Sequence, residues 1–333
     1  NARTYDKMHE FNNFCDSFML GSDQLWTPGA IDLVGYSFFL DFADKDKKKI
    51  AFSTSFGHDT FNAKEEIKET AKDYLSRFDA VSVRENSGID ICRESFGMNV
   101  EQIIDPVFLC SREQYDVLTQ NITLELPSNY LLCYILDPSP EKERAAKAIA
   151  EHEGLEIITV LGIKEYDGAI NKWHTGKVLP KITAEEFLYC IKNCSFLMTD
   201  SHHGTCYGII YEKQYVALVN ASRGKTRFET VAELLDLHSR LYDSPKDVIG
   251  NERVFDSINY SDVYSRLERE KERALSWLTN ALEKPAKNNQ ETINTIKADS
   301  KRENIGLQHK IQKLEKENEF LSKTAENKEI LLA

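Results

Sequence analysis

The chain has 333 residues, of which 41% are hydrophobic and 10% aromatic, so it is too long for one ordinary core and can fill two packed interiors. Its 15 glycines and 8 prolines exclude a fibrous or disordered protein, and no apolar run approaches the ~18 residues that span a bilayer. The 42 Lys and Arg against 54 Asp and Glu give a formal charge of −12, which excludes nucleic acid as a general partner.

The seven cysteines, at positions 15, 92, 110, 133, 190, 194 and 206, lie mostly in apolar segments, which is typical of reduced thiols. Cys190 and Cys194 are four residues apart, but no second Cys or His pair has the spacing of a metal site. The polar start, residues 1–10, has no signal-peptide pattern. We therefore expect a cytoplasmic protein without a metal.

Short apolar, β-branched runs alternate with helical patterns along most of the chain. The predicted strands are Ser17–Gly21, Lys49–Ser55, Ala80–Arg84, Gln102–Ile104, Tyr130–Leu136, Glu156–Leu161, Phe196–Thr199 and Tyr215–Val219. The helices predicted between them are Ala63–Arg77, Ser87–Ser95, Pro140–Glu153, Ala184–Asn193 and Phe228–Leu235. This alternation predicts an α/β protein with parallel sheets and helices on both faces.

A polar connection, Thr119–Asn129, separates two such blocks, so we predict a first Rossmann-like domain over residues 1–120 and a second over 128–250. The first block opens with a helix-like segment, Tyr5–Asn13, directly before a strand. A complete doubly wound domain begins with a strand instead, so we expect the first βα units of this domain to be missing from the chain.

The character of the sequence changes after Val254. Within the segment 253–284, residues Asp262–Leu282 show an amphipathic helical pattern, with Val263, Leu267, Ala274, Leu278 and Leu282 among many charges. Within the predicted tail, residues 290–333, the positions Leu307, Ile311, Leu314, Asn318, Leu321 and Ala325 follow one another at spacings of four and three. This is the heptad pattern of a short coiled coil, which would make the protein a homodimer. The alternatives are a lone helix with frayed ends, since three heptads bury little apolar surface, and a helix that packs back on the globular part.

Polar side chains directly follow several predicted strands. Because ligands of open α/β sheets bind at the carboxyl ends of the strands, these are candidate site residues. In the first block they are Ser22, Asp23, Gln24, Ser55, Gly57 and Arg84. An internal ion pair of Arg84 with Glu85 or Asp105 is the alternative to a ligand contact. We interpret Trp26 as cleft wall or core, and Asp105-Pro106 as a rigid turn at a strand end.

The turn after Phe196–Thr199 is the most informative, and it reads Asp200, Ser201, His202, His203, Gly204 and Thr205 before a helix. The start of a helix presents backbone N–H groups and the positive end of the dipole, which predicts a phosphate or carboxylate site. His203 could exchange a proton near neutral pH. In the alternative interpretation, Asp200 and Ser201 cap the helix and the histidines pack against their neighbours.

A cationic run lies between the Tyr215–Val219 strand and the next helix. It contains Arg223, Lys225 and Arg227, which suggest an anion clamp in an otherwise acidic chain, although a solvated loop is the alternative. No GxGxxG, Walker A or GxSxG motif is present, so dinucleotide-binding, P-loop and α/β-hydrolase functions have little support.

Taken together and in order, these segments resemble the polysaccharide pyruvyl transferase family. The matching pieces are GSDQLW (21–26), IAFSTSFG (50–57), VSVRENSG (81–88), DPVFL (105–109), TDSHHGT (199–205) and RGKTRFETV (223–231). The family is similar in architecture to two-domain GT-B glycosyltransferases, with the active site in the cleft between the domains. The resemblance therefore implies two Rossmann-like domains.

The resemblance also implies transfer of a pyruvyl group from phosphoenolpyruvate, as co-substrate without a further cofactor, to two hydroxyls of a bacterial surface polysaccharide, free or lipid-linked. Matched motif to motif, His203 takes the general acid/base role and Arg84 a donor-binding role. Ser201, Gly204, Thr205, Arg223 and Arg227 would hold the anionic groups, and Asp200 and His202 would line the cleft. We expect Arg84 and Arg227 to approach the donor from opposite domains.

Two positions depart from the family pattern. Ser201 stands where the best-understood branch has an Arg two residues before the catalytic His, and His202 replaces the usual aromatic residue. Two other functions stay open: a glycosyltransferase with a nucleotide-sugar donor, and an inactive scaffold of a glycan-assembly complex.

The tail generates the first testable prediction. We expect residues from about 305 to 325 to associate as a parallel two-stranded coiled coil, since Asn318 at an a position favours two strands in register. Sedimentation velocity should give a dimer for the whole chain and a monomer for a chain ending at Asn289. The same oligomeric state in both would remove the tail as the dimerising element.

Overall fold

A computed structural model of the chain describes residues 5–162, 173–179, 181–219 and 224–287. These residues form two compact units, described in turn below. Unit 1 comprises residues up to Ile104 together with the segment from Glu272 onward, and unit 2 comprises Asp105–Lys271. The predicted coiled coil lies outside the described residues.

Unit 1 is built on a parallel sheet with the strand order β1-β2-β3-β4. Its strands are β1 (Ser17–Leu20), β2 (Lys48–Thr54), β3 (Ala80–Val83) and β4 (Glu101–Gln102). Every residue of the central strand β2 is buried, as expected of a strand that is covered on both faces. The first segment, η1 (Tyr5–Asn13), is a 3₁₀ helix.

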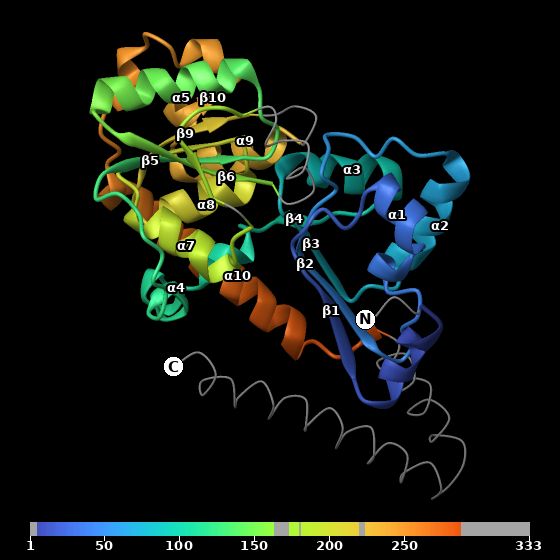
Figure 1. Cartoon of the computed structure of the whole chain (residues 1–333). Helices are drawn as coiled ribbons and strands as arrows, with labels where there is room; N and C mark the ends of the chain where they lie inside the picture. Colours follow the sequence, from blue (N-terminus) through green and yellow to red (C-terminus); the bar gives the residue numbers. More distant parts are fainter. Residues whose placement is uncertain (1–4, 163–172, 180, 220–223, 288–333) are drawn as a thin grey trace, which may run out of the picture. The chain divides into compact units, whose positions relative to one another are not determined.

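One face of this sheet packs against α1 (Pro28–Val34), α2 (Glu65–Ser76) and α3 (Asn86–Phe96), which Figure 1 shows together on one side. Their shared core includes the fully buried Trp26, stacked on Phe39 at a centroid distance of 5.7 Å. The sequence predicts α2 and α3 but not α1, whose seven residues are too few for a recognisable helical period.

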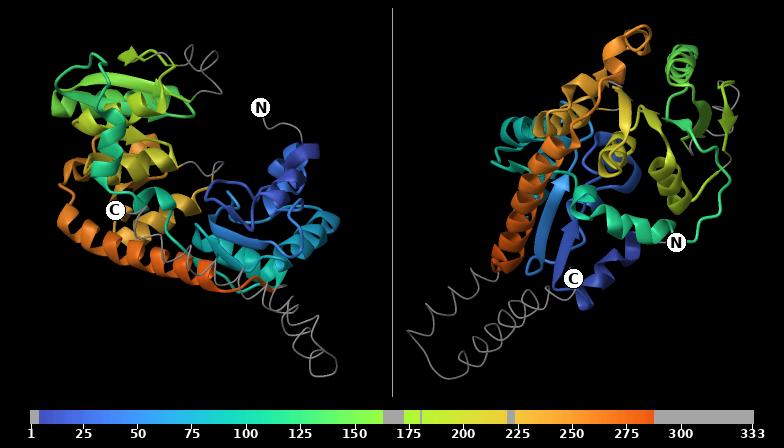
Figure 2. Two further views of the ribbon diagram at one scale, coloured as in Figure 1. Left: turned by 90° about the horizontal axis from the view of Figure 1, so that it is seen from below. Right: turned by 90° about the vertical axis from the view of Figure 1, so that its left-hand side faces the viewer.

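The second half of α10 (Tyr260–Glu283) covers the opposite face of this sheet (Figures 1 and 2). Trp277 stacks on Phe52 of β2 at 5.8 Å, and Arg273 donates to the backbone and side-chain oxygens of Gln102. Lys48 donates to the carbonyls of Leu282 and Lys284, so a lysine from the start of β2 satisfies carbonyls at the end of the helix.

An irregularity in β2 precedes the predicted site loop of unit 1. The register of β2 with β3 shifts between Ala51 and Thr54, and Ser53 adopts a φ of 53°. This backbone conformation is costly for a residue with a Cβ. Hydrogen bonds support it, because the Ser53 hydroxyl donates to the carbonyl of Ile103 at 2.8 Å and its N–H donates to Ser82 Oγ at 2.9 Å.

Unit 2 contains a parallel sheet with the strand order β10-β9-β8-β5-β6-β7. Its strands in chain order are β5 (Tyr130–Ile135), β6 (Glu156–Leu161), β7 (Lys177–Val178), β8 (Phe196–Thr199), β9 (Gln214–Leu218) and β10 (Leu241–Tyr242). The order reverses direction between β5 and β8, which is the topological switch point where ligands of such sheets bind. The two-residue edge strands β7 and β10 were not predicted, because two residues show no alternation.

Alternate residues of β5 face different helices. Leu131, Cys133 and Ile135 pack with α5 (Pro140–Glu153), whereas Tyr130 and Tyr134 contact α7 (Ala184–Asn193). The helix α8 (His202–Ile210) packs on the same side as α7, and α9 (Thr226–Leu235) follows β9. Parallel sheets with helices on both faces confirm the predicted fold class.

The boundary between the units lies at Ile104/Asp105, whereas the sequence predicted domains over residues 1–120 and 128–250; these domain bounds stay a prediction. The segment after Asp105 forms η3 (Pro106–Leu109) and α4 (Arg112–Thr119), and both contact unit 2. The ring of Tyr115 lies 5.3 Å from that of Tyr207, and Lys192 pairs with Asp116 at 3.0 Å. These tertiary contacts place the segment in unit 2, and the sequence of the linker does not reveal them.

The helix predicted over Asp262–Leu282 is present as α10, which begins at Tyr260, and a 3₁₀ helix, η9 (Glu252–Phe255), precedes it within the segment 253–284. Arg240 donates to the carbonyls of Val254 and Asp256 and so holds this connection in a non-helical path. Among the described residues, no helix is long and apolar enough to cross a membrane.

A second testable prediction concerns the packing of α3. A Cβ on Gly88 would lie 2.9 Å from Val83 Cβ, whereas a Cβ on Gly29 of α1 meets nothing within 4 Å. We expect Gly88→Ala to lower the free energy of unfolding of unit 1 by about 1–3 kcal/mol. The control Gly29→Ala should leave it unchanged or raise it by about 0.5–1 kcal/mol. Urea denaturation of both variants measures this, and equal midpoints would contradict the close-packing argument.

Candidate functional site

The turn between β8 and α8 lies at the carboxyl end of the sheet of unit 2, next to the switch point. Ser201 is the N-cap of α8, because its hydroxyl accepts the N–H of Gly204 at 3.3 Å. The N–H of Thr205 is bonded to the Ser201 carbonyl at 3.0 Å. The amides of Gly204 and Thr205, predicted to bind an anion, are therefore already used within the turn.

Gly204 and Thr205 have structural roles in this turn. A Cβ on Gly204 would lie 2.4 Å from Thr199 Oγ1 and 2.9 Å from Tyr134 Cδ1, so only glycine lets α8 approach β8 and β5 this closely. The Thr205 hydroxyl donates back to the carbonyl of Ser201 at 3.2 Å. The glycine thus serves helix packing, where the sequence suggested approach of a ligand.

The side chain of Asp200 is fully buried. Its carboxylate accepts the backbone N–H groups of Leu136 and Asp137 at 2.6 and 3.0 Å and pairs with Lys142 Nζ at 2.6 Å. It thereby joins the end of β8 to the loop that follows β5, whose amides need an acceptor. Asp200 thus has a structural role, and its cleft-lining role stays a prediction.

The two adjacent histidines occupy different environments around one carboxylate. His202 is buried, and its Nε2 lies 3.2 Å from Asp105 Oδ2. The side chain of His203 is 39% exposed, and its Nε2 lies 3.9 Å from the same oxygen. The structure therefore joins His203, the predicted acid/base, to a buried acid from a distant part of the chain.

Asp105 is a candidate functional residue that the sequence analysis missed. It was interpreted as part of a rigid turn, and the structure confirms a turn, because Asp105 caps η3 by accepting the N–H of Val107 at 3.1 Å. The available signal was the acid itself, placed directly after a predicted strand and inside the DPVFL motif. Nothing in the local sequence indicates that it meets a histidine 97 residues away.

The structure describes two of the three residues of the predicted anion clamp, Lys225 and Arg227. Arg223 lies outside the described residues, whereas Arg227 lies buried in the first turn of α9. Its neighbour Phe228 packs edge-to-face on His202 at 5.8 Å, so the first turns of α8 and α9 are in contact. Lys225 pairs with Asp243 at 3.0 Å and Glu229 at 3.1 Å, and these hydrogen bonds raise its pKa.

In unit 1 the predicted residues gather around Glu85. Its Oε1 accepts the Ser55 hydroxyl at 2.9 Å, the Phe56 N–H at 2.9 Å and the Gly57 N–H at 3.3 Å. Its Oε2 lies 3.8 Å from Nε of Arg84, and both side chains are almost completely buried. The alternative left open for Arg84, an internal ion pair with Glu85, is thus present, and its donor-binding role stays a prediction.

The loop of Ser22, Asp23 and Gln24 packs beside Ser55 and Gly57. Gln24 Nε2 donates to the Gly57 carbonyl at 3.2 Å, and the Ser55 N–H donates to the Asp23 carbonyl at 3.2 Å. Gly57 has a φ of 73°, and a Cβ there would lie 2.5 Å from Gln24 Nε2, so this position requires glycine. The structure brings these residues together, and their cleft-lining role stays a prediction.

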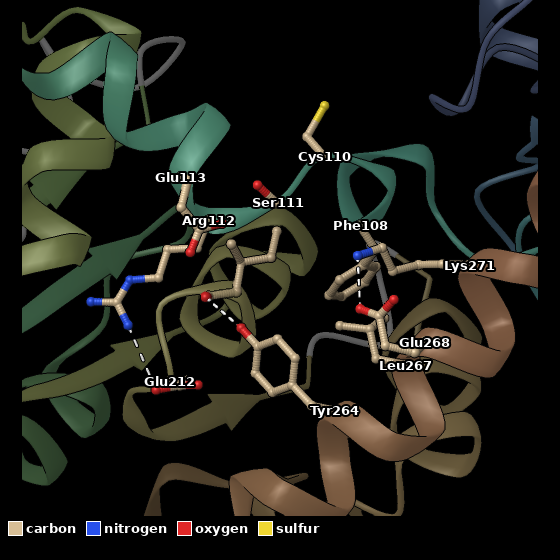
Figure 3. A pocket seen from close by; sticks show the side chains of 11 residues that line it. Phe108, Cys110, Ser111, Arg112, Glu113, Glu212, Tyr264, Leu267, Glu268 and Lys271 are labelled. Atoms are coloured by element: carbon tan, nitrogen blue, oxygen red, sulfur yellow. Dashed lines mark hydrogen bonds and ion pairs between the residues drawn. The ribbon is translucent and has the colours of Figure 1, made fainter. Parts of the chain in front are cut away.

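A pocket of about 250 Å³ lies elsewhere in unit 2 (Figure 3). It is lined by Phe108, Cys110, Ser111, Arg112, Glu113, Ile210, Glu212, Tyr264, Leu267, Glu268 and Lys271. Its cations are paired, because Arg112 lies 3.6 Å from Glu212 and Lys271 lies 2.8 Å from Glu268. None of the predicted site residues lines it, and we assign it no role in the chemistry.

Within the described parts of the chain, no group of three or more His, Cys, Asp or Glu side chains is arranged to hold a metal ion. Cys190 and Cys194 are both buried, and burial raises the pKa of each thiol to about 12. Thiols of this kind stay protonated, which favours the interpretation of this pair as a core face.

The sequence was compared with known protein families and with curated proteins. The sequence profile described as polysaccharide pyruvyl transferase matches residues 2–222. A search of curated proteins gives no match.

Among solved structures, the UDP-GlcNAc 2-epimerase from Neisseria meningitidis bound to UDP-GlcNAc is similar at 10% identity and a TM-score of 0.49, over 81% of this chain and 80% of that one. The Methanocaldococcus jannaschii UDP-GlcNAc 2-epimerase, in complex with UDP-GlcNAc and UDP, is similar at 12% identity and a TM-score of 0.49, over 83% of this chain and 79% of that one. The glycotransferase of kitacinnamycin is similar at 12% identity and a TM-score of 0.45, over 80% of this chain and 74% of that one.

A third testable prediction concerns Glu85. Glu85→Gln replaces a carboxylate that accepts three hydrogen bonds by an amide and removes the buried charge paired with Arg84, so we expect a loss of roughly 3–5 kcal/mol in the unfolding free energy of unit 1. The control Glu69→Gln changes an exposed residue of α2 and should stay within about 0.5 kcal/mol. Guanidinium denaturation followed by tryptophan fluorescence measures both, and equal stabilities would show that Glu85 does not organise this loop.

Proposed function

Because this chain belongs to the polysaccharide pyruvyl transferase family, we propose that it transfers a pyruvyl group from phosphoenolpyruvate to two hydroxyls of a saccharide. The observation that carries the proposal is His203, half-exposed at the start of α8 and 3.9 Å from a buried carboxylate, within the segment that the family profile covers. An imidazole in that setting can give and take a proton at neutral pH.

The proposed reaction balances in two additions. In the first, C3 of the enol accepts a proton and the first sugar hydroxyl adds to C2, losing its own proton. This gives a tetrahedral carbon that bears a methyl group, the carboxylate, the phosphate and the sugar oxygen. In the second, the C2–O bond to phosphate breaks, phosphate leaves with the electron pair, and the second hydroxyl adds and releases its proton. The products are a cyclic ketal and inorganic phosphate.

His203 is assigned both proton transfers of the first addition. Protonated His203 gives its proton to C3, and the neutral ring then accepts the proton of the attacking hydroxyl. A single histidine can do both because the ring returns to its starting state. Proton transfer by a positioned side chain contributes typically about 10²–10⁴-fold to rate.

Cations must hold the carboxylate and phosphate of the donor. We assign this to Arg84, Arg227 and Arg223, with Ser201 as a neutral donor at the start of α8. Ser201 stands where the better-known branch of the family has an arginine. In this chain another residue must therefore make one of the contacts to the carboxylate or phosphate of the donor. Arg227 supports the assignment best, since it lies in the turn of α9 whose Phe228 touches His202.

A fourth testable prediction concerns donor and catalyst together. Calorimetric titration should show binding of phosphoenolpyruvate and no binding of a panel of nucleotide sugars. Binding of a nucleotide sugar alone would favour glycosyl transfer, and binding of neither would favour a scaffold. His203→Gln should leave the affinity for phosphoenolpyruvate almost unchanged, because the side chain acts on the enol carbon and not on the anionic groups.

Turnover is followed as phosphate released from phosphoenolpyruvate in the presence of hexose and N-acetylhexosamine glycosides. We expect His203→Gln to lower kcat by about 10²-fold or more. The matched control His238→Gln changes an exposed histidine of unit 2 outside this site and should keep kcat unchanged. A fully active His203→Gln enzyme would remove His203 as the acid/base.

A further inference from the structure

We infer that Asp105 and His202 form a positioning pair for His203: Asp105 supplies a fixed negative charge to the His203 ring, and His202 holds the oxygen that carries it. This inference rests on the proposed function of His203. It concerns two residues to which the proposed reaction assigns no proton transfer and no contact with the donor, and all three residues belong to unit 2.

Asp105 is held rigidly by its position at the start of η3. Its side chain has no exposed surface, and Oδ1 accepts the N–H of Val107 at 3.1 Å. Pro106 occupies the first position of η3, which restricts the backbone next to the carboxylate. With Oδ1 fixed by the cap, Oδ2 is the oxygen that faces both histidines.

His202 determines how Oδ2 is bound. A carboxylate only accepts hydrogen bonds, so the contact of 3.2 Å is satisfied when Nε2 of His202 carries the proton. The ring cannot leave this position easily, because Phe228 packs edge-to-face on it at 5.8 Å and Cys206 Sγ lies 3.5 Å from Nε2. His202 therefore orients Oδ2 from the buried side.

His203 approaches Oδ2 from the exposed side. At 3.9 Å the contact is longer than a hydrogen bond, so its effect is the attraction between a buried negative charge and the imidazolium. That attraction favours the protonated ring, which is the form that gives a proton to the enol carbon. In the proposal Nε2 faces Asp105 and Nδ1 exchanges the proton with substrate.

Two tyrosines belong to the described surroundings of His203, and neither supplies a negative charge. Tyr207 lies one turn after His203 on α8, and burial chiefly raises its pKa, with Cys206 and Asp105 adding to the effect. Tyr115 of α4 contacts Tyr207, and burial raises its pKa as well. Both phenols are neutral at physiological pH, and we assign the effect on the His203 ring to Asp105, whose Oδ2 lies 3.9 Å from His203 Nε2.

A phenylalanine at position 202 could fill the contact with Phe228 but could not donate to Oδ2 of Asp105. The substitution His202→Phe therefore removes the hydrogen bond and keeps the packing, which makes it a conservative test.

The test combines NMR titration with kinetics. The whole chain is labelled at histidine Cε1, and the His203 signal is assigned by its loss in His203→Gln. Asp105→Asn keeps an acceptor for the Val107 N–H and removes the charge, so His203 should titrate at lower pH and kcat should fall by about 10–10²-fold. KM for phosphoenolpyruvate should change little. The control Asp73→Asn, which removes an exposed carboxylate of α2, should change neither quantity.

The double variant separates positioning from a general loss of structure. We expect His202→Phe alone to lower kcat by about 3–10-fold, and Asp105→Asn with His202→Phe to be no slower than Asp105→Asn alone, because both act through Oδ2. Additive losses in kcat would overturn the role of His202. An unchanged titration of His203 in Asp105→Asn would overturn the role of Asp105. The titration needs no substrate, so it stands even if the protein transfers no pyruvyl group.

Discussion

Buried carboxylates that accept backbone N–H groups hold the loops at the carboxyl ends of the strands, and the candidate site depends on them. Glu85 gathers Phe56, Gly57 and Ser55 in unit 1. Asp200 binds the loop after β5, and Asp105 begins η3. A loop that lies under other elements cannot leave its amides unbonded, and an ionised carboxylate is a strong acceptor that can serve several of them at once. These acids place the loops, and the loops carry the histidines and arginines.

The sequence predicts the fold class well because parallel strands buried on both faces are short, apolar and β-branched. The eight predicted strands coincide with strands of the structure within two residues at each end. Elements without an internal period were missed: α1 and α4 are seven and eight residues long, and β7 and β10 have two residues each. The unit boundary lies before the predicted linker, because contacts such as that of Tyr115 with Tyr207 assign the segment after Asp105 to unit 2.

The candidate site was predicted less completely, for a physical reason. Reading the residues after each strand finds polar side chains at the correct edge of the sheet, but it cannot separate those that face a ligand from those that bond the loops. Asp200 and Gly204 both have structural contacts that the sequence did not indicate: Asp200 bonds to Leu136 and Asp137, and Gly204 lies close to Thr199. Asp105 requires knowledge of a contact between distant segments. Family motifs point to His203, and only the fold connects it with its carboxylate.

The division of α10 between the two units has a consequence for how the protein is made. Unit 2 is one uninterrupted stretch of chain, so it has all its residues once Lys271 has been synthesised. Unit 1 begins earlier but finishes later, because the face of its sheet around Phe52 is covered by Trp277, and Lys48 meets its carbonyl partners only when residues 282–284 are present. A nascent chain therefore carries an uncovered apolar sheet face throughout the synthesis of unit 2. Unit 1 is therefore complete only after unit 2, and an uncovered apolar sheet face of this kind is a site at which nascent chains can aggregate.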